Sequence, residues 1–240
     1  MADRHVIIGD VHGCISELKA LLKKVEFDPG KDIGISLGDL TDRGPDSAAC
    51  ILLMKDMGFK LCHSNHDARF INWKAKENAL ARGHVDHNDV LLKDVHVTTL
   101  KGIQGHPRES EIWEYLQNYH LIYEFSSSDT VYHCIHGGYI PANGPSTSKR
   151  WIIRLRKLEN KTNQPIKHDS SKDATIWPKL WQGPQRVIFG HMIFNKPAFF
   201  EHAIGIDTGC VFGGRLSALV VNKNGSEKIV SVAAQKSYCE

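Results

Sequence analysis

The chain has 240 residues, of which 41% are hydrophobic and 24% charged, and its formal net charge is +3 at pH 7. These proportions are typical of globular proteins and exclude disordered, collagen-like and low-complexity chains. Since no apolar run approaches the ~18–20 residues that span a bilayer and the N-terminus lacks the apolar core of a signal peptide, we expect a soluble, cytoplasmic protein.

The first half of the chain alternates strand-like and helical patterns. Hydrophobic periodicity predicts strands at 5–8, 33–37 and 59–62 and helices at 15–25, 48–57, 67–82 and 109–119. Ser16 is a possible N-cap of the first helix, and the polar stretch that runs to about residue 105 is expected to be a loop. Strands that alternate with helices pair in parallel.

The second half contains strand-like runs at short spacing. They lie at 130–135, 186–189, 202–206, 216–221 and 228–233. Short spacing favours hairpins, so we expect this half to be largely antiparallel. The fold class is therefore α/β, with mixed sheets, which could be two packed face to face, and helices on the outside. We interpret residues 1–240 as one domain, and its six cysteines, which form no CxxC pair, as reduced thiols.

One segment differs in composition. Residues 143–182 contain nine basic and three acidic residues, a local charge of +6. This basic insertion is either a solvated surface or a surface that steers phosphates. Its three tryptophans could stack a base or simply pack the insertion down; they are Trp151, Trp177 and Trp181.

Polar residues directly follow several of the apolar runs. They are Asp10 and His12, Asp39, Asn65 and His66, His136, and His191. The carboxyl ends of strands border the ligand crevice in open α/β sheets, so these side chains are expected to gather at one place. Carboxylate, imidazole and amide oxygen together favour manganese, iron or zinc over calcium. Asp39 is the natural carboxylate to bridge two ions.

Five short blocks carry a resemblance to a known family. They are Gly9-Asp10-Val11-His12-Gly13, Gly38-Asp39-Leu40-Thr41-Asp42-Arg43-Gly44, Asn65-His66-Asp67, His136-Gly137-Gly138 and Gly190-His191. In this order they resemble the calcineurin-like metallophosphoesterases, and more narrowly the phosphoprotein phosphatase superfamily. The resemblance implies two mixed sheets packed as a sandwich flanked by helices, and a site for two divalent ions, with manganese favoured and iron or zinc as alternatives. Carried over by motif, Asp10 and His12 hold the first ion, Asn65, His136 and His191 the second, and Asp39 bridges them.

The C-terminal part narrows the resemblance. The run Asp207-Thr208-Gly209-Cys210-Val211-Phe212-Gly213-Gly214 is similar to bacterial bis(5'-nucleosyl)-tetraphosphatases and to the phosphatase domain of bacterial polynucleotide kinase-phosphatases. The chain also departs from the family pattern, with His63 and Ser64 before the Asn-His pair and Asp67 after it. These departures concern substrate preference more than the metal site.

The family chemistry assigns further roles. A hydroxide shared by two metal ions would attack phosphorus directly, without a phosphoenzyme. His66 is placed to protonate the leaving group, and Asp42 to hold its imidazole. Arg43 offers a planar fork for phosphoryl oxygens.

Two further assignments are more open. A second arginine is expected between the two ligand histidines, with Arg154 as the candidate and Arg150 and Arg156 as alternatives. Asp207 either orients a ligand or substrate or caps a turn. The remaining ten histidines, among them His96, match no motif position and are interpreted as ordinary surface or core residues.

The predicted function is hydrolysis of phosphomonoesters or nucleotide phosphoanhydrides by a dinuclear metal enzyme. A serine/threonine protein phosphatase is the alternative, because Thr41-Asp42-Arg43 keeps the aspartate typical of protein phosphatases. A phosphate-binding scaffold of the same fold is the non-enzyme alternative. Expected partners are a phosphorylated small molecule, a nucleotide or a phosphoprotein, and nucleic-acid ends are a further option; no membrane partner is expected.

Overall fold

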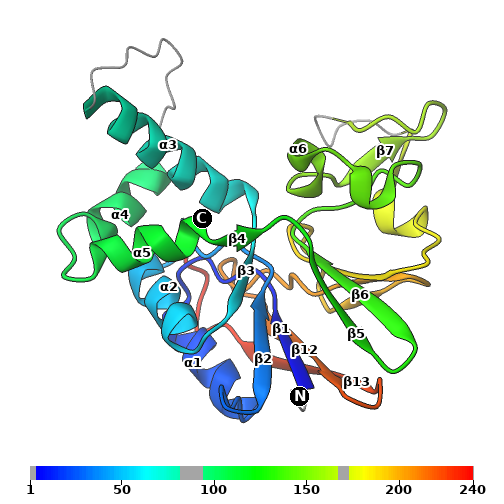
Figure 1. Cartoon of the computed structure of the whole chain (residues 1–240), viewed down its shortest axis with the longest axis horizontal. Helices are drawn as coiled ribbons and strands as arrows, with labels where there is room; N and C mark the ends of the chain where they lie inside the picture. Colours follow the sequence, from blue (N-terminus) through cyan, green and yellow to red (C-terminus); the bar gives the residue numbers. More distant parts are fainter. Residues whose placement is uncertain (1–3, 82–93, 167–172, 240) are drawn as a thin grey trace.

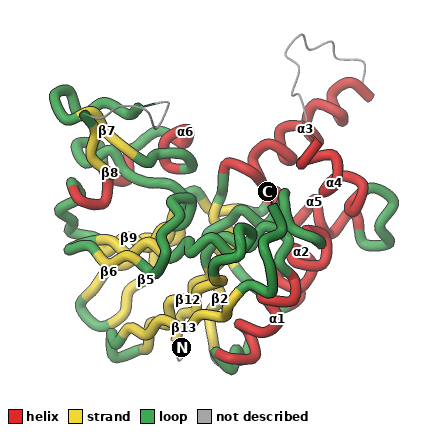
Figure 2. Tube along the Cα trace, turned by 180° about the vertical axis from the view of Figure 1, so that it is seen from behind, coloured by secondary structure: helices red, strands yellow, loops and turns green. Residues whose placement is uncertain are grey.

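Two mixed β-sheets form the centre of the computed structural model, which describes residues 4–81, 94–166 and 173–239. Figure 1 shows helices α1 to α5 gathered on one side of the sheets and the basic insertion, with α6 and β7, on the other. The view from behind in Figure 2 shows the same division. The expected α/β class with two large mixed sheets is confirmed.

The first sheet has the strand order β13-β12-β1-β2-β3-β4. Its strands are β1 (Arg4–Ile8), β2 (Asp32–Ser36), β3 (Lys60–Cys62), β4 (Tyr119–His120), β12 (Arg215–Asn222) and β13 (Glu227–Ala233). The strands β1 to β4 are parallel, as the alternating pattern predicts, and β12 pairs antiparallel with both β1 and β13.

The second sheet has the order β10-β11-β9-β6-β5. Its strands are β5 (Tyr123–Ser127), β6 (Thr130–Ile135), β9 (Arg186–Phe189), β10 (Ala198–Phe199) and β11 (Ala203–Gly205). As predicted for the second half, β5 pairs antiparallel with β6, β10 with β11 and β12 with β13; the exceptions are β6 with β9 and β9 with β11, which pair in parallel. The basic insertion separates β6 from β9 and supplies the long crossover that parallel strands need.

The α-helices before β4 cover the first sheet. They are α1 (Ile15–Lys24), α2 (Ser47–Asp56), α3 (Asn65–Ala81), α4 (Asp94–Ile103) and α5 (Glu109–Gln117). Helix α1 begins at Ile15 as expected, but its N-cap is Cys14 rather than Ser16. Helix α2 begins as expected, because the Asp46 carboxylate accepts the Ala49 N–H at 2.8 Å. Helix α4 lies in a stretch that the sequence predicts to be a loop. The prediction is wrong here because the polar residues of the stretch obscure its helical periodicity.

Buried hydrophobic residues form three clusters, and they do so because successive side chains of a strand point to opposite faces of its sheet. Ile7 of β1 points between the two sheets, where it packs in a cluster with Ile188 and Ile204 of the second sheet. Val6 and Ile8 point the other way, into the cluster that buries the helices. A third cluster lies between the second sheet and the basic insertion.

The basic insertion is a packed substructure rather than a simple loop. It contains η1 (Gly144–Ser146), α6 (Lys149–Ile152), η2 (Trp177–Lys179) and the two-stranded sheet of β7 (Lys157–Glu159) and β8 (Ala174–Ile176). Trp177 is 0% and Trp181 5% exposed, so these rings pack the insertion and cannot stack a base. Among the described residues no helix is long and apolar enough to cross a membrane.

Candidate metal centre

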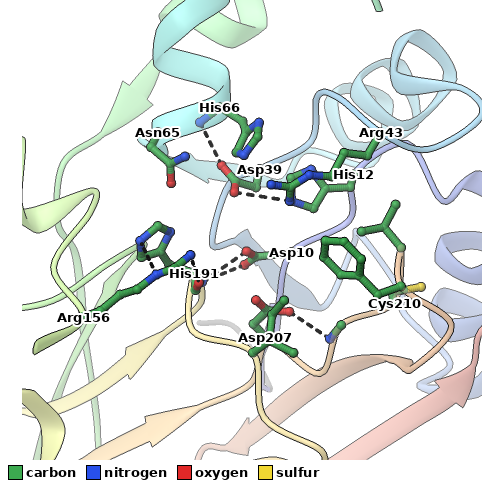
Figure 3. A pocket seen from close by; sticks show the side chains of 14 residues that line it. Asp10, His12, Asp39, Arg43, Asn65, His66, Arg156, His191, Asp207 and Cys210 are labelled. Carbon is green, nitrogen blue, oxygen red and sulfur yellow. Dashed lines mark hydrogen bonds and ion pairs between the residues drawn. The ribbon is translucent and has the colours of Figure 1, made fainter. Parts of the chain in front are cut away.

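Five strand ends place the predicted ligands at one edge of the two sheets. In the first sheet, Asp10 and His12 follow β1, Asp39 follows β2 and Asn65 follows β3; in the second sheet, His136 follows β6 and His191 follows β9. Figure 3 shows five of them around one cavity of about 250 Å³. The sixth, His136, is completely buried beside it. The structure thus brings together all six side chains.

Strained backbone concentrates at this edge. Among the described residues, eight non-glycine positions have a positive φ, and five of these belong to the predicted site: His12, Asp39, Asp42, Arg43 and His191. Such conformations cost free energy and persist where the surroundings enforce them, which occurs mainly at functional sites. A glycine is needed as well, since a Cβ at Gly190 would lie 2.2 Å from Asp10 Oδ1.

Asp39 lies at the centre of the ligand set. Its Oδ2 is 3.5 Å from His12 Nε2 and 3.4 Å from His136 Nε2. The side-chain amide of Asn65 lies 3.0 Å from the same nitrogen of His136. Ligand atoms of Asp39, His136 and His191 all lie within 4.8 Å of one another. One carboxylate therefore faces predicted ligands from both sheets.

Each histidine is oriented by a backbone carbonyl. His12 Nδ1 lies 2.7 Å from the Thr41 carbonyl oxygen, and His136 Nδ1 lies 2.9 Å from that of Leu37. His191 Nε2 lies 3.2 Å from the Arg154 carbonyl oxygen. Because Nδ1 of His12 and of His136 can each donate a proton to a carbonyl, Nε2 of these two rings keeps its lone pair for a metal. Burial lowers the pKa of His12 to about 4, which keeps that ring neutral at pH 7.

The site contains three buried carboxylates. Asp10, Asp39 and Asp207 are 5%, 2% and 5% exposed. Burial, followed by the negative charges of Asp207 and Asp39, raises the pKa of Asp10, and burial raises that of Asp207. Buried charges require a partner, and oxygen donors combined with imidazole nitrogens suit manganese, iron or zinc. The residues present therefore fit divalent ions.

His66 and Asp42 form a pair beside the ligands. His66 Nδ1 lies 2.5 Å from Asp42 Oδ2, and the Asp42 side chain is completely buried. Burial alone would lower the pKa of His66, but the Asp39 and Asp42 carboxylates raise it above its ordinary value. The imidazole lines the cavity, so a proton on it faces the space where a substrate would bind.

Helix α4 adds two residues that the sequence analysis did not assign to the site. His96 Nδ1 lies 2.7 Å from Asp42 Oδ2, and Thr99 Oγ1 accepts the Asp42 backbone N–H at 3.1 Å. The two residues are three positions apart and so share a face of the helix. In the sequence, the spacing of His96 and Thr99 indicates only that they share one face of a helix. It does not indicate which residue this face contacts.

Asp67 supports the loop that carries Asp39 and Asp42. Its carboxylate accepts the backbone N–H of Leu40 and of Thr41, each at 3.1 Å, and the Thr41 hydroxyl at 2.8 Å. The position that departs from the usual glutamate therefore has a structural role behind the site.

The arginines differ in their relation to the cavity. Arg43 and Arg156 line it (Figure 3), whereas Arg154 does not and contributes its carbonyl group to His191. Arg156 Nε lies 3.2 Å from His191 Nε2, and Arg43 Nη1 lies 2.8 Å from His12 Nε2. Arg150 packs its guanidinium 5.1 Å from the centroid of the Trp151 ring. Of the three arginines considered in the basic insertion, the geometry favours Arg156.

Asp207 caps a turn, which is one of the two roles considered for it, and its side chain also lines the cavity. Its Oδ1 accepts the Gly209 backbone N–H at 3.0 Å, which caps the turn that follows. The same side chain lines the cavity next to Asp10, as Figure 3 shows.

Two packed mixed sheets whose strand ends hold a buried set of carboxylates, imidazoles and an amide define an α/β metalloprotein. The model of the calcineurin-like phosphoesterase family matches residues 4–224, and the chain belongs to this family. Family membership implies divalent metal ions, and with the names of its relatives it indicates an enzyme that hydrolyses phosphoester or phosphoanhydride bonds.

Relatives of two kinds are similar in sequence. The chain is 26% identical to serine/threonine-protein phosphatase 1 of Salmonella typhimurium, over 89% of this chain and 90% of the relative. It is 29% identical to the asymmetrical bis(5'-nucleosyl)-tetraphosphatase of Geobacillus thermodenitrificans, over 89% and 88%.

Solved structures share the fold. A crystal structure of a proposed diadenosine tetraphosphatase matches with a TM-score of 0.75 and 27% identity, over 98% of this chain and 95% of that one. A yeast serine/threonine phosphatase matches at a TM-score of 0.58 and 14% identity, over 97% and 80%, which supports the fold alone.

Proposed function

We propose that the chain is a dinuclear metal-dependent phosphoesterase that hydrolyses phosphomonoesters and nucleotide phosphoanhydrides. The observation that carries the proposal is the position of Asp39 between ligands of both sheets, with His66 beside it on the cavity wall. Asp10 and His12 would hold one ion, Asn65, His136 and His191 the other, with Asp39 between them. When bound, two divalent ions, manganese being favoured, supply charge to the phosphoryl oxygens and activate a water for attack.

The remaining residues divide the work of binding and proton transfer. Arg43 and Arg156 present guanidinium groups to the cavity, where they would hold phosphoryl oxygens. His66 would donate a proton to the departing oxygen, and Asp42 would fix the orientation of its ring. This acid–base pair also distinguishes an enzyme from a phosphate-binding scaffold, which needs no proton donor.

The substrate is proposed to be a nucleotide or another small phosphoester. Several relatives are named bis(5'-nucleosyl)-tetraphosphatases. Protein phosphatase activity is the second candidate, because a protein phosphatase is a relative of comparable similarity and Asp42 keeps the acid–base pair intact. Five buried free thiols among six cysteines suit a reducing compartment, which is why we place the protein in the cytoplasm.

Metal analysis and a substrate panel test the proposal. Purified protein loaded with Mn²⁺ should contain two ions per chain and hydrolyse glycerol phosphate and diadenosine tetraphosphate, and chelation should abolish both activities. Full turnover by metal-free protein would refute the mechanism. A clear preference for phosphopeptides over both small substrates would favour the protein phosphatase.

A further inference from the structure

The rim of the metal cavity carries an unusual exposed apolar surface. Among the described residues, only four large hydrophobic side chains are exposed: Val131, Ile193, Phe199 and Phe212. Two of these four, Ile193 at 54% and Phe212 at 43% exposure, line the cavity. Single exposed hydrophobic residues are normal, but two that share the rim of a polar site indicate a binding surface.

The loop that presents Phe212 is firmly held. The Phe212 backbone N–H donates to the Gly209 carbonyl and that of Gly213 to the Cys210 carbonyl, both at 3.0 Å. Gly209 has a φ of +67°, and a Cβ there would lie 3.0 Å from Ile193 Cγ2. The close approach places Ile193 against the same loop. The aromatic ring is therefore exposed on ordered backbone, so little conformational entropy is lost when a ligand covers it.

Phe212 lies beside the group that would hold phosphate. The Arg43 guanidinium carbon is 5.2 Å from the centroid of the Phe212 ring, while Arg43 Nη1 contacts the metal-ligand candidate His12. A phosphoryl group bound by Arg43 would therefore carry its ester substituent close to Phe212. A planar aromatic substituent would bury the face of the Phe212 ring, whereas a small alkyl group would leave that face exposed to solvent.

We propose that Phe212 and Ile193 form a subsite that binds the nucleobase of a nucleotide substrate by stacking and apolar contact. This inference rests on the proposed phosphoesterase function and deepens it. Because Trp177 and Trp181 are buried, stacking on the basic insertion does not offer an alternative through those rings. The subsite selects for the aromatic part of the substrate, while Arg43 and Arg156 bind its phosphates.

A matched ligand pair isolates the contribution of the base. AMP and ribose 5-phosphate share charge and sugar and differ only in adenine. Both ligands are phosphomonoesters, so they are treated as competing substrates: their competition constants are measured with Mn²⁺-loaded protein from the initial rate of glycerol release from glycerol phosphate. We expect AMP to bind roughly tenfold more tightly, since stacking of one base contributes about that much or more. Phe212→Leu should remove most of this preference, and Phe212→Trp should keep it.

The control is Phe199→Leu, which removes an exposed phenylalanine of β10 that does not line the cavity. It should leave the preference for AMP unchanged. Equal binding of both ligands by the wild type, or a preference that survives in Phe212→Leu, would overturn the proposal. An equal loss for both ligands in Phe212→Leu would also overturn it, because Phe212 would then only support Arg43.

Failure of the proposed function gives a different result. If the wild type hydrolyses neither glycerol phosphate nor diadenosine tetraphosphate, the phosphoesterase proposal fails. Binding of AMP and ribose 5-phosphate to the Mn²⁺-loaded protein is then compared by calorimetry, which needs no turnover. The same tenfold difference and the same response to Phe212→Leu are expected, and their absence would refute the subsite.

Discussion

The strand-end ligands and the rim of the cavity are built in different ways. Each ligand follows a strand by one to four residues, so the two sheets fix its position through backbone pairing. The rim is assembled from the loop after β11 and the basic insertion, and helix α4 contacts Asp42 behind the cavity; all three approach the site only through tertiary packing. The positions of the predicted ligands are therefore specified locally, whereas the rim depends on the assembled fold.

The largest effect is expected at the centre of the ligand half. Asp39→Ala removes the one carboxylate that faces ligands of both sheets, so metal content should fall for both ions and kcat by roughly 10³-fold or more. Elemental analysis and kinetics at fixed Mn²⁺ measure the two quantities. Asp129→Ala, which removes an exposed carboxylate of the β5–β6 turn, is the control and should change neither.

The proton donor should show the next largest effect. His66→Asn should leave metal content near normal and lower kcat by roughly 10²–10⁴-fold on glycerol phosphate, the usual range for general acid catalysis. The deficit should be much smaller on nitrophenyl phosphate, because nitrophenolate leaves without a proton. Equal losses on both substrates would show that His66 binds phosphate or metal instead. His120→Asn, an exposed histidine of β4, should have no effect.

The two halves also differ in how far sequence reasoning reaches them. Asp10, Asp39 and Asn65 were found because polar residues at strand ends converge in any open sheet. Sequence reasoning gives His96 no role, since no neighbouring residue in the chain indicates that α4 packs against Asp42. The parallel pairing of β6 and β9 was missed because strand spacing does not reveal what the inserted segment does between them.

The role of helix α4 gives an intermediate prediction. His96→Asn should lower kcat on glycerol phosphate about tenfold without changing KM, because Asp42 loses one of the groups that position it. In a His66→Asn background the same change should cost almost nothing, since residues of one network are not additive. Additive losses would mean that His96 acts independently of the proton donor.

Substitution of a second buried histidine, His133, is the control that distinguishes loss of Asp42 positioning from loss of protein stability. His133 is 2% exposed and binds Tyr139 and Glu124 away from the cavity. His133→Asn should lower the free energy of unfolding as His96→Asn does. Its effect on kcat should be the same for glycerol phosphate and nitrophenyl phosphate, because it does not touch Asp42.

The smallest effect is expected for the basic side of the rim, where Arg156 and Arg150 form a matched pair. Arg156 lines the cavity and contacts His191, whereas Arg150 packs on Trp151 and does not line it. Arg156→Gln should raise KM for diadenosine tetraphosphate several-fold, since an exposed charge contributes about 1 kcal/mol or less, and should raise it less for glycerol phosphate. Arg150→Gln should leave both values near those of the wild type. Measured at low and high ionic strength, the Arg156→Gln deficit should shrink with salt. An equal response of both arginines would assign the effect to the overall charge of the basic insertion rather than to a phosphate contact in the cavity.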